Sequence, residues 1–257
     1  MKIIAIIPAR LKSTRLNKKL LIKFNGLEMI EHVRRRAILS QAFHNVYVAT
    51  GDEEIEDLIK RKNGKVIKTF QTHENGTLRA AEAIKNIDAS HIVLIQGDEP
   101  LILPEHLQKI VAAIKSKPNY DVWNLTAKLD QESHLDDCSQ VKCSINEEDQ
   151  ILYCFRRSPS YLPKIKQMNY IRKMLGVIGY KKEILEAIPN LRKSIIEKFE
   201  SIEQMRLISN NLSINSIEVD ECLPSVNVNS DINLVLNCIK NNSKQQIIIK
   251  NILDRFN

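Results

Sequence analysis

Short apolar runs alternate with helical periods through the first hundred residues of the sequence. The runs are IIAIIP at residues 3–8, VYVAT at 46–50 and HIVLIQ at 91–96. Each lacks the polar alternation of a half-exposed strand, so each is typical of a strand buried on both faces. Strands separated by helices at this interval predict βαβ units. We therefore expect an α/β fold with a mixed, mainly parallel sheet and helices on both sides of it.

The other elements follow from the same periodicities. Before Pro104 we predict helices from Glu28, at 53–60 and at 77–87, and a short strand at 65–68. After it we predict a helix at 105–116, strands at 121–128, 140–146, 151–156, 175–180 and 213–219, helices at 182–187 and 201–210, and two terminal helices starting near Asn229 and Ser243. The strand-rich part, about residues 120–180, predicts a lobe beside the main sheet, with a ligand cleft between them. No linker or repeat divides the chain, so a single domain is expected.

Composition limits the classes of protein that need considering. With 257 residues and 43% hydrophobic content, the chain can bury a substantial core. No apolar run approaches the roughly 18 residues of a membrane helix, and the N-terminus lacks a signal-peptide pattern, so we expect a cytoplasmic protein without a membrane partner. The five cysteines are odd in number and lack CxxC spacing. Free, reduced thiols are expected rather than disulfides or a metal site.

The net charge of +7 suits an anionic partner. The basic residues are spread along the chain, and no basic arm or interleaved aromatic pattern of a nucleic-acid-binding module accompanies them. A phosphate-rich small molecule therefore fits better than a polynucleotide.

Five cations follow the first predicted strand, in the segment IPARLKSTRLNKKLL at residues 7–21. They are Arg10, Lys12, Arg15, Lys18 and Lys19, with the hydroxyls of Ser13 and Thr14 between them. Ligands of open α/β sheets bind beyond the carboxyl ends of the strands, and guanidinium forks match phosphate oxygens. The segment therefore predicts a phosphate-binding loop, although it lacks the Walker pattern and a solvated basic turn is the alternative.

An acidic pair follows the third long strand, in IQGDEPL at residues 95–101. Gly97 lets the chain turn, and Asp98 and Glu99 would then lie at the same sheet edge as the basic loop. Mg²⁺ binds through one or two carboxylates together with substrate phosphates, so this pair is a candidate magnesium site. An ordinary surface turn is the alternative.

The segment HENGTLRAAEA at residues 73–83 predicts a helix N-terminus. Thr77 can cap the helix, and Arg79 would face outward on its first turn. Such an arrangement is either a cradle for a carboxylate or phosphate or an ordinary capped helix.

Several segments, in order, resemble the motifs of the 3-deoxy-manno-octulosonate (KDO) cytidylyltransferases. The first loop resembles the family pattern IPARxxSxRLPxKxL. The others are VATGDEEI at 48–55, HENGTLRAAEA at 73–83, VLIQGDEPL at 93–101, FRRSPSYLP at 155–163, LGVIGY at 175–180 and ESIEQMRL at 200–207. Single matches of this length are weak, whereas an ordered series is specific.

The resemblance implies a sheet of the nucleotide-diphospho-sugar transferase type and one cytidylyltransferase domain over residues 1–257. The lobe at about 120–180 would serve the sugar side and dimerisation, so a homodimer is expected. The implied reaction transfers CMP from CTP to the anomeric hydroxyl of KDO or a related ulosonic acid, releases pyrophosphate and uses Mg²⁺. Positioning and charge neutralisation supply most of the catalysis in such transfers.

The resemblance also implies roles for individual residues. The nucleotide would be bound by Arg10, Ser13, Arg15, Lys19 and Gln96. The sugar acid would be bound by Arg79, Arg157, Tyr180, Glu203 and Gln204. Catalysis would fall to Arg10, Lys19 and Asp98, and the metal to Asp98 and the residue at the position of the family's second aspartate, Asn229.

The sequence departs from the family pattern mainly on the sugar side. Met174 and Ile178 replace a histidine and a tyrosine, and Leu78 replaces an acidic residue. Asn229 replaces the second aspartate, although Asp231 lies two residues on, and Asn17 and Lys18 replace Pro-Gly in the first loop. Three interpretations stay open. They are a KDO-type cytidylyltransferase, the same fold acting on another anionic acceptor, and a catalytically weak nucleotide-binding paralogue.

Overall fold

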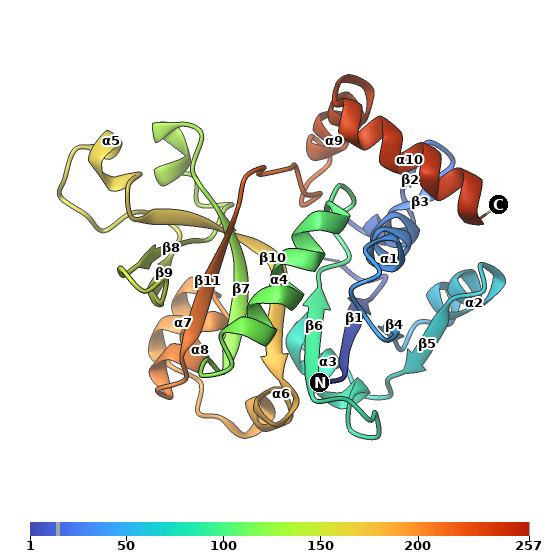
Figure 1. Cartoon of the computed structure of the whole chain (residues 1–257), viewed down its shortest axis with the longest axis horizontal. Helices are drawn as coiled ribbons and strands as arrows, with labels where there is room; N and C mark the ends of the chain where they lie inside the picture. Colours follow the sequence, from blue (N-terminus) through green and yellow to red (C-terminus); the bar gives the residue numbers. More distant parts are fainter. Residues whose placement is uncertain (14–15, 257) are drawn as a thin grey trace.

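A central sheet organises the computed structural model, which describes residues 1–13 and 16–256 (Figure 1). Nine strands form this sheet within the described residues. They are β1 Ile3–Ala9, β4 Val46–Thr50, β5 Lys65–Lys68, β6 His91–Ile95, β7 Val122–Ala127, β8 Lys142–Ile145, β9 Ile151–Phe155, β10 Ile171–Lys181 and β11 Ile214–Val219.

The sheet is mixed and mainly parallel, as predicted. Its main path runs β11-β7-β10-β6-β1-β4-β5. Strands β6, β1, β4 and β5 pair in parallel, and so do β7 and β11. Between these two groups lies β10, which is antiparallel to both β6 and β7. The carboxyl ends of β1 and β6 therefore lie side by side.

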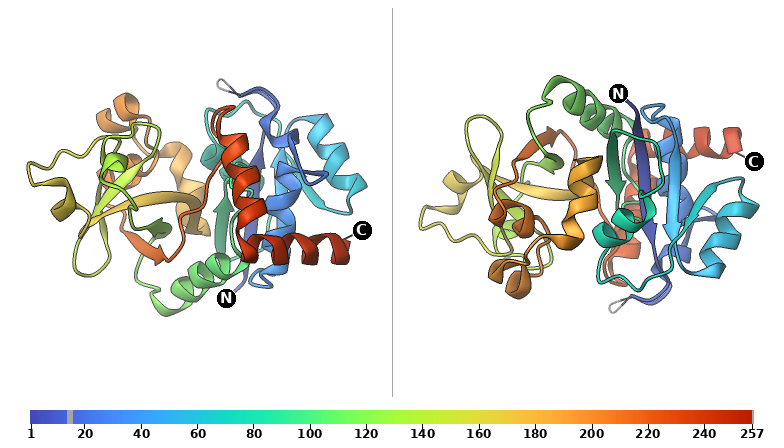
Figure 2. Two further views of the ribbon diagram at one scale, coloured as in Figure 1. Left: turned by 90° about the horizontal axis from the view of Figure 1, so that it is seen from above. Right: turned by 90° about the horizontal axis from the view of Figure 1, so that it is seen from below.

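Helices cover both faces of the sheet (Figure 2). They are α1 Met29–Leu39, α2 Glu53–Arg61, α3 Gly76–Ala83, α4 Pro104–Ser116, α5 Lys164–Gln167, α6 Lys182–Ala187, α7 Ile195–Glu200, α8 Gln204–Ser209, α9 Asp231–Asn241 and α10 Ser243–Phe256. The core of one face contains residues of α1, α2, α4, α9 and α10, and that of the other face contains residues of α3, α6 and α8. Short 3₁₀ turns occur at Lys19–Leu21, Glu132–Leu135 and Ile188–Asn190.

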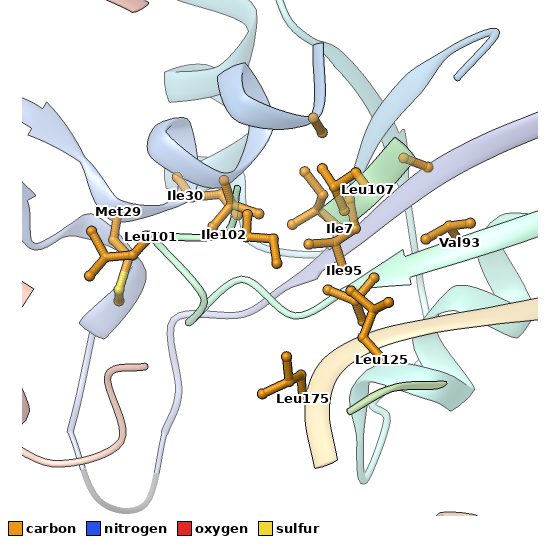
Figure 3. Packing of buried hydrophobic residues seen from close by; sticks show 14 of the residues in the cluster. Ile7, Met29, Ile30, Val93, Ile95, Leu101, Ile102, Leu107, Leu125 and Leu175 are labelled. Carbon is orange, nitrogen blue, oxygen red and sulfur yellow. The ribbon is translucent and has the colours of Figure 1, made fainter. Parts of the chain in front are cut away.

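The first strand is buried on both faces, as its unbroken apolar run predicted. Ile7 packs on the α1 and α4 side together with Ile95 and Leu107 (Figure 3). Ile4 and Ile6 belong to the core on the α3 side. Alternate side chains of a strand point to opposite faces, so β1 serves both cores.

The strand-rich lobe is built on the first half of β10. Its residues Ile171–Lys173 pair with β8, which pairs in turn with β9. The predicted strand at 175–180 is therefore longer than expected, because its start is paired inside the lobe. A small separate core of Leu129, Leu135, Phe155 and Ile171 fills the lobe.

Several helix boundaries differ from the predictions. Helix α3 ends at Ala83 rather than at residue 87. The predicted helix at 201–210 is α8, which starts at Gln204, because Ser201 adopts a left-handed conformation (φ 54°) and ends a separate helix, α7. The cap of α3 is Asn75 rather than Thr77, since its side chain accepts a hydrogen bond from the Leu78 amide at 2.9 Å. The first terminal helix, α9, starts at Asp231 rather than Asn229.

A hairpin of β2 (Lys23–Phe24) and β3 (Leu27–Glu28) was not predicted. Its turn consists of Asn25 and Gly26, both with positive φ (50° and 79°). The Asn-Gly pair is the strongest short-range hairpin signal, so the sequence carried the information.

Two further expectations concern cysteines and membranes. The five cysteines, Cys138, Cys143, Cys154, Cys222 and Cys238, are all free, as predicted. Within the part of the chain that the structure describes, no helix combines the length and apolarity needed to cross a bilayer.

Helix α1 carries buried charges beneath α10. Glu31 is fully buried and accepts hydrogen bonds from Arg34 Nε at 2.5 Å and Arg35 Nε at 2.8 Å. Arg36 is also buried and donates to the Ile102 carbonyl at 3.3 Å. One carboxylate therefore neutralises part of a cluster of three arginines inside the protein.

His32, in the same helix, should make the fold sensitive to acid. Burial lowers the pKa of this histidine to about 4, from 6.5, and its Nε2 donates to the Phe24 carbonyl at 2.8 Å. Between these two values the unfolded state binds more protons, so stability is full above pH 6.5 and falls as the pH drops toward 4. We expect this group to remove about 2 kcal/mol of unfolding free energy between pH 7 and pH 5.

Urea unfolding of the wild type and of His32→Gln at both pH values checks this prediction. The variant keeps a donor for Phe24 but does not titrate, so its loss between pH 7 and pH 5 should be smaller by that amount. Equal losses in the two proteins would contradict it.

Candidate active site

A cavity of about 750 Å³ lies beyond the carboxyl ends of β1 and β6. Its volume is in the range of small-molecule sites. The lining comes from the loop after β1, the loop after β6, the start of α3, residues 138–141 and Arg156 of the lobe, the middle of β10 and residues 201–204. The segment before α9 and its first turns add residues 223–225, 227, 228, 231 and 234. The cleft therefore occurs where the topology of an open α/β sheet predicts ligand binding.

Lys19 and Asp98 form an ion pair in the lining of the cavity. The Lys19 Nζ lies 2.6 Å from Asp98 Oδ2, and both side chains are largely buried. Lys19 Nζ also donates to the Val226 carbonyl at 3.2 Å, and the Val226 amide donates to the Asp98 carbonyl at 3.0 Å. The segment before α9 is thus tied to both loops, and the basic loop meets the acidic turn as predicted.

The first loop also contacts the start of α3. Arg10 Nη1 donates to the carbonyls of His73 and Glu74 at 3.1 and 3.2 Å. At Gly76 a β-carbon would lie 2.9 Å from Pro8 Cγ, so only glycine allows this approach of α3 to β1. Arg10 and the α3 N-terminus consequently face the same cavity.

Two hydrogen bonds join the segment after β6 to the middle of β10. The Gln96 amide donates to the Gly176 carbonyl at 2.7 Å, and the Gly176 amide donates to Glu99 Oε1 at 3.1 Å. A β-carbon at Gly176 would lie 2.7 Å from that Glu99 oxygen. Burial, followed by the nearby charge of Asp98, raises the pKa of Glu99 to about 7.

The cavity lining also holds Arg79, Glu203 and Gln204. Arg79 is buried rather than facing outward, which corrects the prediction, because its Nη1 donates to Thr69 Oγ1 at 2.5 Å. Burial lowers the pKa of Arg79 and raises the pKa of Glu203. Gln204 Nε2 donates to Asn124 Oδ1 at 3.2 Å, which fixes its orientation.

The cavity offers few ligands for a metal. Among the described residues, no group of three or more His, Cys, Asp or Glu side chains could hold an ion. The carboxylates of Asp98 and Asp231 both line the cavity, and Asp231 Oδ2 accepts hydrogen bonds from the amides of Asn227 and Val228. This set fits an ion that takes one or two carboxylates and completes its shell with substrate phosphates, as Mg²⁺ does.

Comparison with known proteins identifies the family. The family model for cytidylyltransferases matches residues 4–214. The 3-deoxy-manno-octulosonate cytidylyltransferase of Escherichia coli is 32% identical over 225 residues, which cover 88% of this chain and 91% of that protein. The enzyme of the same name from Rickettsia prowazekii is 35% identical over 93% of this chain and 96% of its own length. The chain belongs to the 3-deoxy-manno-octulosonate cytidylyltransferase family.

Solved structures agree with this membership. A CMP:2-keto-3-deoxy-manno-octonic acid synthetase complexed with CTP superposes with a TM-score of 0.87 at 30% identity, covering 93% of this chain and 99% of that one. A 4-diphosphocytidyl-2C-methyl-D-erythritol synthase from Anaerococcus prevotii shares only 12% identity, with a TM-score of 0.60, and so supports the fold alone. The chain therefore has the nucleotidyltransferase fold and is a cytidylyltransferase, as the motif series predicted.

Most of the residues selected through the family motifs meet in one cavity. Those in its lining are Arg10, Ser13, Lys19, Arg79, Gln96, Asp98, Glu203 and Gln204. Arg15 lies outside the described residues. The set comes from segments almost 200 residues apart, so the fold has brought together what the sequence only suggested.

Three predicted residues do not reach the lining. Arg157 is exposed outside it, and its neighbour Arg156 lines the cavity instead, donating to the carbonyls of Cys138 and Glu200 at 2.8 Å each. Tyr180 is buried within the sheet opposite Ile92, where burial raises the pKa of its phenol.

Asn229 is the third, since it is exposed and absent from the lining, whereas Asp231 lines it. The turn before α9 directs Asp231 rather than Asn229 toward the cavity, because the Asp231 carboxylate binds the amides of that turn. Asp231 was predicted as a possible substitute for Asn229 in binding the metal. No feature of the sequence distinguished Arg156 from its neighbour Arg157.

Proposed function

We propose that the chain transfers CMP from CTP to the anomeric hydroxyl of KDO or a related ulosonic acid, with release of pyrophosphate. The observation that carries this proposal is the meeting of Arg10, Lys19 and Asp98 in one cavity at the carboxyl ends of β1 and β6. The likeness to a synthetase complexed with CTP supports the choice of nucleotide.

The proposed step is a displacement at the α-phosphorus of CTP. The anomeric oxygen of the acceptor forms a bond to that phosphorus and loses its proton, while the bond to the bridging oxygen of the β-phosphate breaks and pyrophosphate leaves. Lys19 and Arg10 would neutralise the charge of the triphosphate, and Ser13 would donate a hydrogen bond to it. Gln96 would bind the nucleotide, and Arg79, Glu203 and Gln204 would orient the sugar acid.

Mg²⁺ is the cofactor that we propose for this site. Asp98 would hold it together with the triphosphate, and Asp231 replaces Asn229 as the second candidate ligand because it lines the cavity. Bound Mg²⁺ would neutralise phosphate charge. The reaction would take place in the cytoplasm, where CTP is made, and would supply activated KDO for lipopolysaccharide.

Pyrophosphate release tests the proposal. With CTP, Mg²⁺ and KDO the protein should release pyrophosphate, and excess EDTA should abolish that release. CTP binding by calorimetry, measured in parallel, separates the alternatives. Binding without turnover on any ulosonic acid would favour the nucleotide-binding paralogue, and absence of both would contradict the proposal.

We also propose that the protein is a homodimer formed through the strand-rich lobe and α7. Exposed apolar side chains gather on this part of the chain, namely Leu152, Tyr161, Ile165, Ile195 and Phe199. Burying these exposed apolar side chains against a second copy of the chain would remove them from water, which favours association.

Light scattering coupled to size-exclusion chromatography tests this association. The wild type should elute with twice the mass of one chain, and Phe199→Lys should shift it toward the monomer. Phe70, which follows β5, is a matched control, because its side chain is as exposed as that of Phe199 (83% and 84%). Phe70→Lys should leave the mass unchanged, and a monomeric wild type would contradict the proposal.

A further inference from the structure

One guanidinium group connects two segments of the cavity lining. Arg156 follows β9, is partly buried and lines the cavity. Its Nε donates to the Glu200 carbonyl at 2.8 Å, and its Nη2 donates to the Ser201 carbonyl at 3.3 Å. Its Nη1 donates to the Cys138 carbonyl at 2.8 Å. We call this arrangement of one arginine and three carbonyls the Arg156 clasp.

The chemistry of arginine suits the clasp. A guanidinium has five N–H groups in a rigid planar fork, whereas the ammonium of a lysine is a compact point charge on a flexible stem. Glu200 is the last residue of α7, and the final carbonyls of a helix lack partners within that helix. Arg156 supplies such a partner from outside the helix.

Both segments that the clasp joins carry cavity residues. Residues 138–141 line the cavity, and so do residues 201–204, which include Glu203 and Gln204. Arg156 holds the first residue of each segment by its carbonyl. The placement of Glu203 and Gln204 relative to the lobe therefore depends on the clasp.

Helices α7 and α8 form a unit that does not need the clasp to stay folded. Arg206 of α8 donates two hydrogen bonds to Glu197 of α7, at 2.6 and 2.9 Å, and both side chains are buried. This unit also contacts β9 directly, where the Cys154 amide donates to Met205 Sδ at 3.3 Å. Without the clasp, the unit should stay folded and attached at Met205, but turn more freely relative to the lobe.

We infer that Arg156 is a positioning residue for the acceptor, because the clasp holds Glu203 and Gln204 where they orient the sugar acid. This inference rests on the proposed function, which assigns these two side chains to the acceptor. A misplacement of about 1 Å at a reacting site can cost about 100-fold in rate. The nucleotide would be bound by the loops after β1 and β6, whereas the clasp joins residues 138, 200 and 201. Loss of the guanidinium should therefore affect the acceptor and spare CTP.

Kinetics of Arg156→Ala test the inference. With KDO as the acceptor, kcat/KM for the acceptor should fall by about 10- to 100-fold, mainly through a higher KM, because groups that orient the acceptor also bind it. The Kd of CTP, measured by calorimetry, should equal that of the wild type, which also shows that the variant is folded. A wild-type KM for KDO, or an equal loss of affinity for CTP, would overturn the inference.

Arg156→Lys separates positioning from a direct contact between the charge and the sugar acid. Lysine keeps the charge but cannot bridge the three carbonyls, so this variant should show the same rise in KM for KDO as Arg156→Ala. If Arg156→Lys kept the KM of the wild type, the charge alone would suffice and the inference would be wrong. Arg192 is the control, since it is exposed, precedes α7 and is absent from the lining. Arg192→Ala should leave both the KM for KDO and the Kd of CTP unchanged.

Failure of the inference can be told from failure of the proposed function, because the wild type is measured with the same acceptors. If the wild type releases pyrophosphate and Arg156→Ala does so with an unchanged KM for the acceptor, the clasp alone is rejected. If the wild type releases no pyrophosphate with any ulosonic acid, the proposed function is rejected, and the inference with it.

Discussion

Asp98→Asn should lower kcat/KM for CTP-dependent pyrophosphate release by roughly 100- to 1000-fold. The substitution keeps the size of the side chain but removes the charge that lies 2.6 Å from Lys19 Nζ. It also removes the carboxylate proposed to hold Mg²⁺, so the variant should need a higher Mg²⁺ concentration for half-maximal rate. Steady-state kinetics over a range of Mg²⁺ concentrations measure both effects.

A matched substitution shows whether the effect belongs to the cavity. Asp88 also pairs with a lysine, Lys2, at 2.8 Å, but it is almost fully exposed and lies in the loop before β6, at the amino end of that strand. Asp88→Asn should leave kcat/KM unchanged. If Asp98→Asn kept the rate and Mg²⁺ dependence of the wild type, the role given to Asp98 would be wrong.

Glu31→Gln should be the most destabilising single polar substitution that we foresee. Glu31 is the carboxylate that pairs with Arg34 and Arg35, and all three side chains are buried. Removing its charge leaves the arginines inside the protein without an acid, which costs about 3 to 5 kcal/mol of unfolding free energy. Domains of this kind have about 5 to 15 kcal/mol in total, so a large part of the stability would be lost.

Urea unfolding followed by circular dichroism measures this loss. Glu54 is the control, since it pairs with Lys18 at 2.6 Å but both side chains are about half exposed. Glu54→Gln should leave the midpoint almost unchanged, because exposed ion pairs contribute little. If Glu31→Gln unfolded at the same urea midpoint as the wild type, the expected loss would be wrong, and the arginines would have found other partners or water.

The sequence predicted the fold best where a segment had one strong period. The apolar runs that form β1, β4 and β6 could be read as strands buried on both faces, and their spacing implied parallel pairing. The direction of β10 could not be predicted, because a run of apolar residues carries no information about whether its neighbours are parallel. The boundary between α7 and α8 was missed because it depends on the left-handed conformation of Ser201, which serine seldom adopts.

The candidate site was predictable where its residues follow a strand directly. Arg10 and Asp98 come just after β1 and β6, so the parallel pairing of those strands fixed their proximity. Arg157 and Tyr180 were chosen from motifs alone. Arg156 lines the cavity, whereas the next residue, Arg157, lies outside it. Which of the two arginines enters the cavity depends on the path of the chain after β9, and the residue types do not reveal it.

The position of β10 has a consequence for how the chain folds. It pairs with β6, whose residues precede it by more than 80 positions, and it is also the neighbour of β7. During synthesis the strands from β1 to β6 can assemble with their helices first, but β6 remains an open edge until residues 171–181 have emerged. Pairings over such sequence separations are slow to form, and an unpaired edge invites association with other chains. We therefore expect nascent chains that stop before β10 to be the aggregation-prone species of this protein.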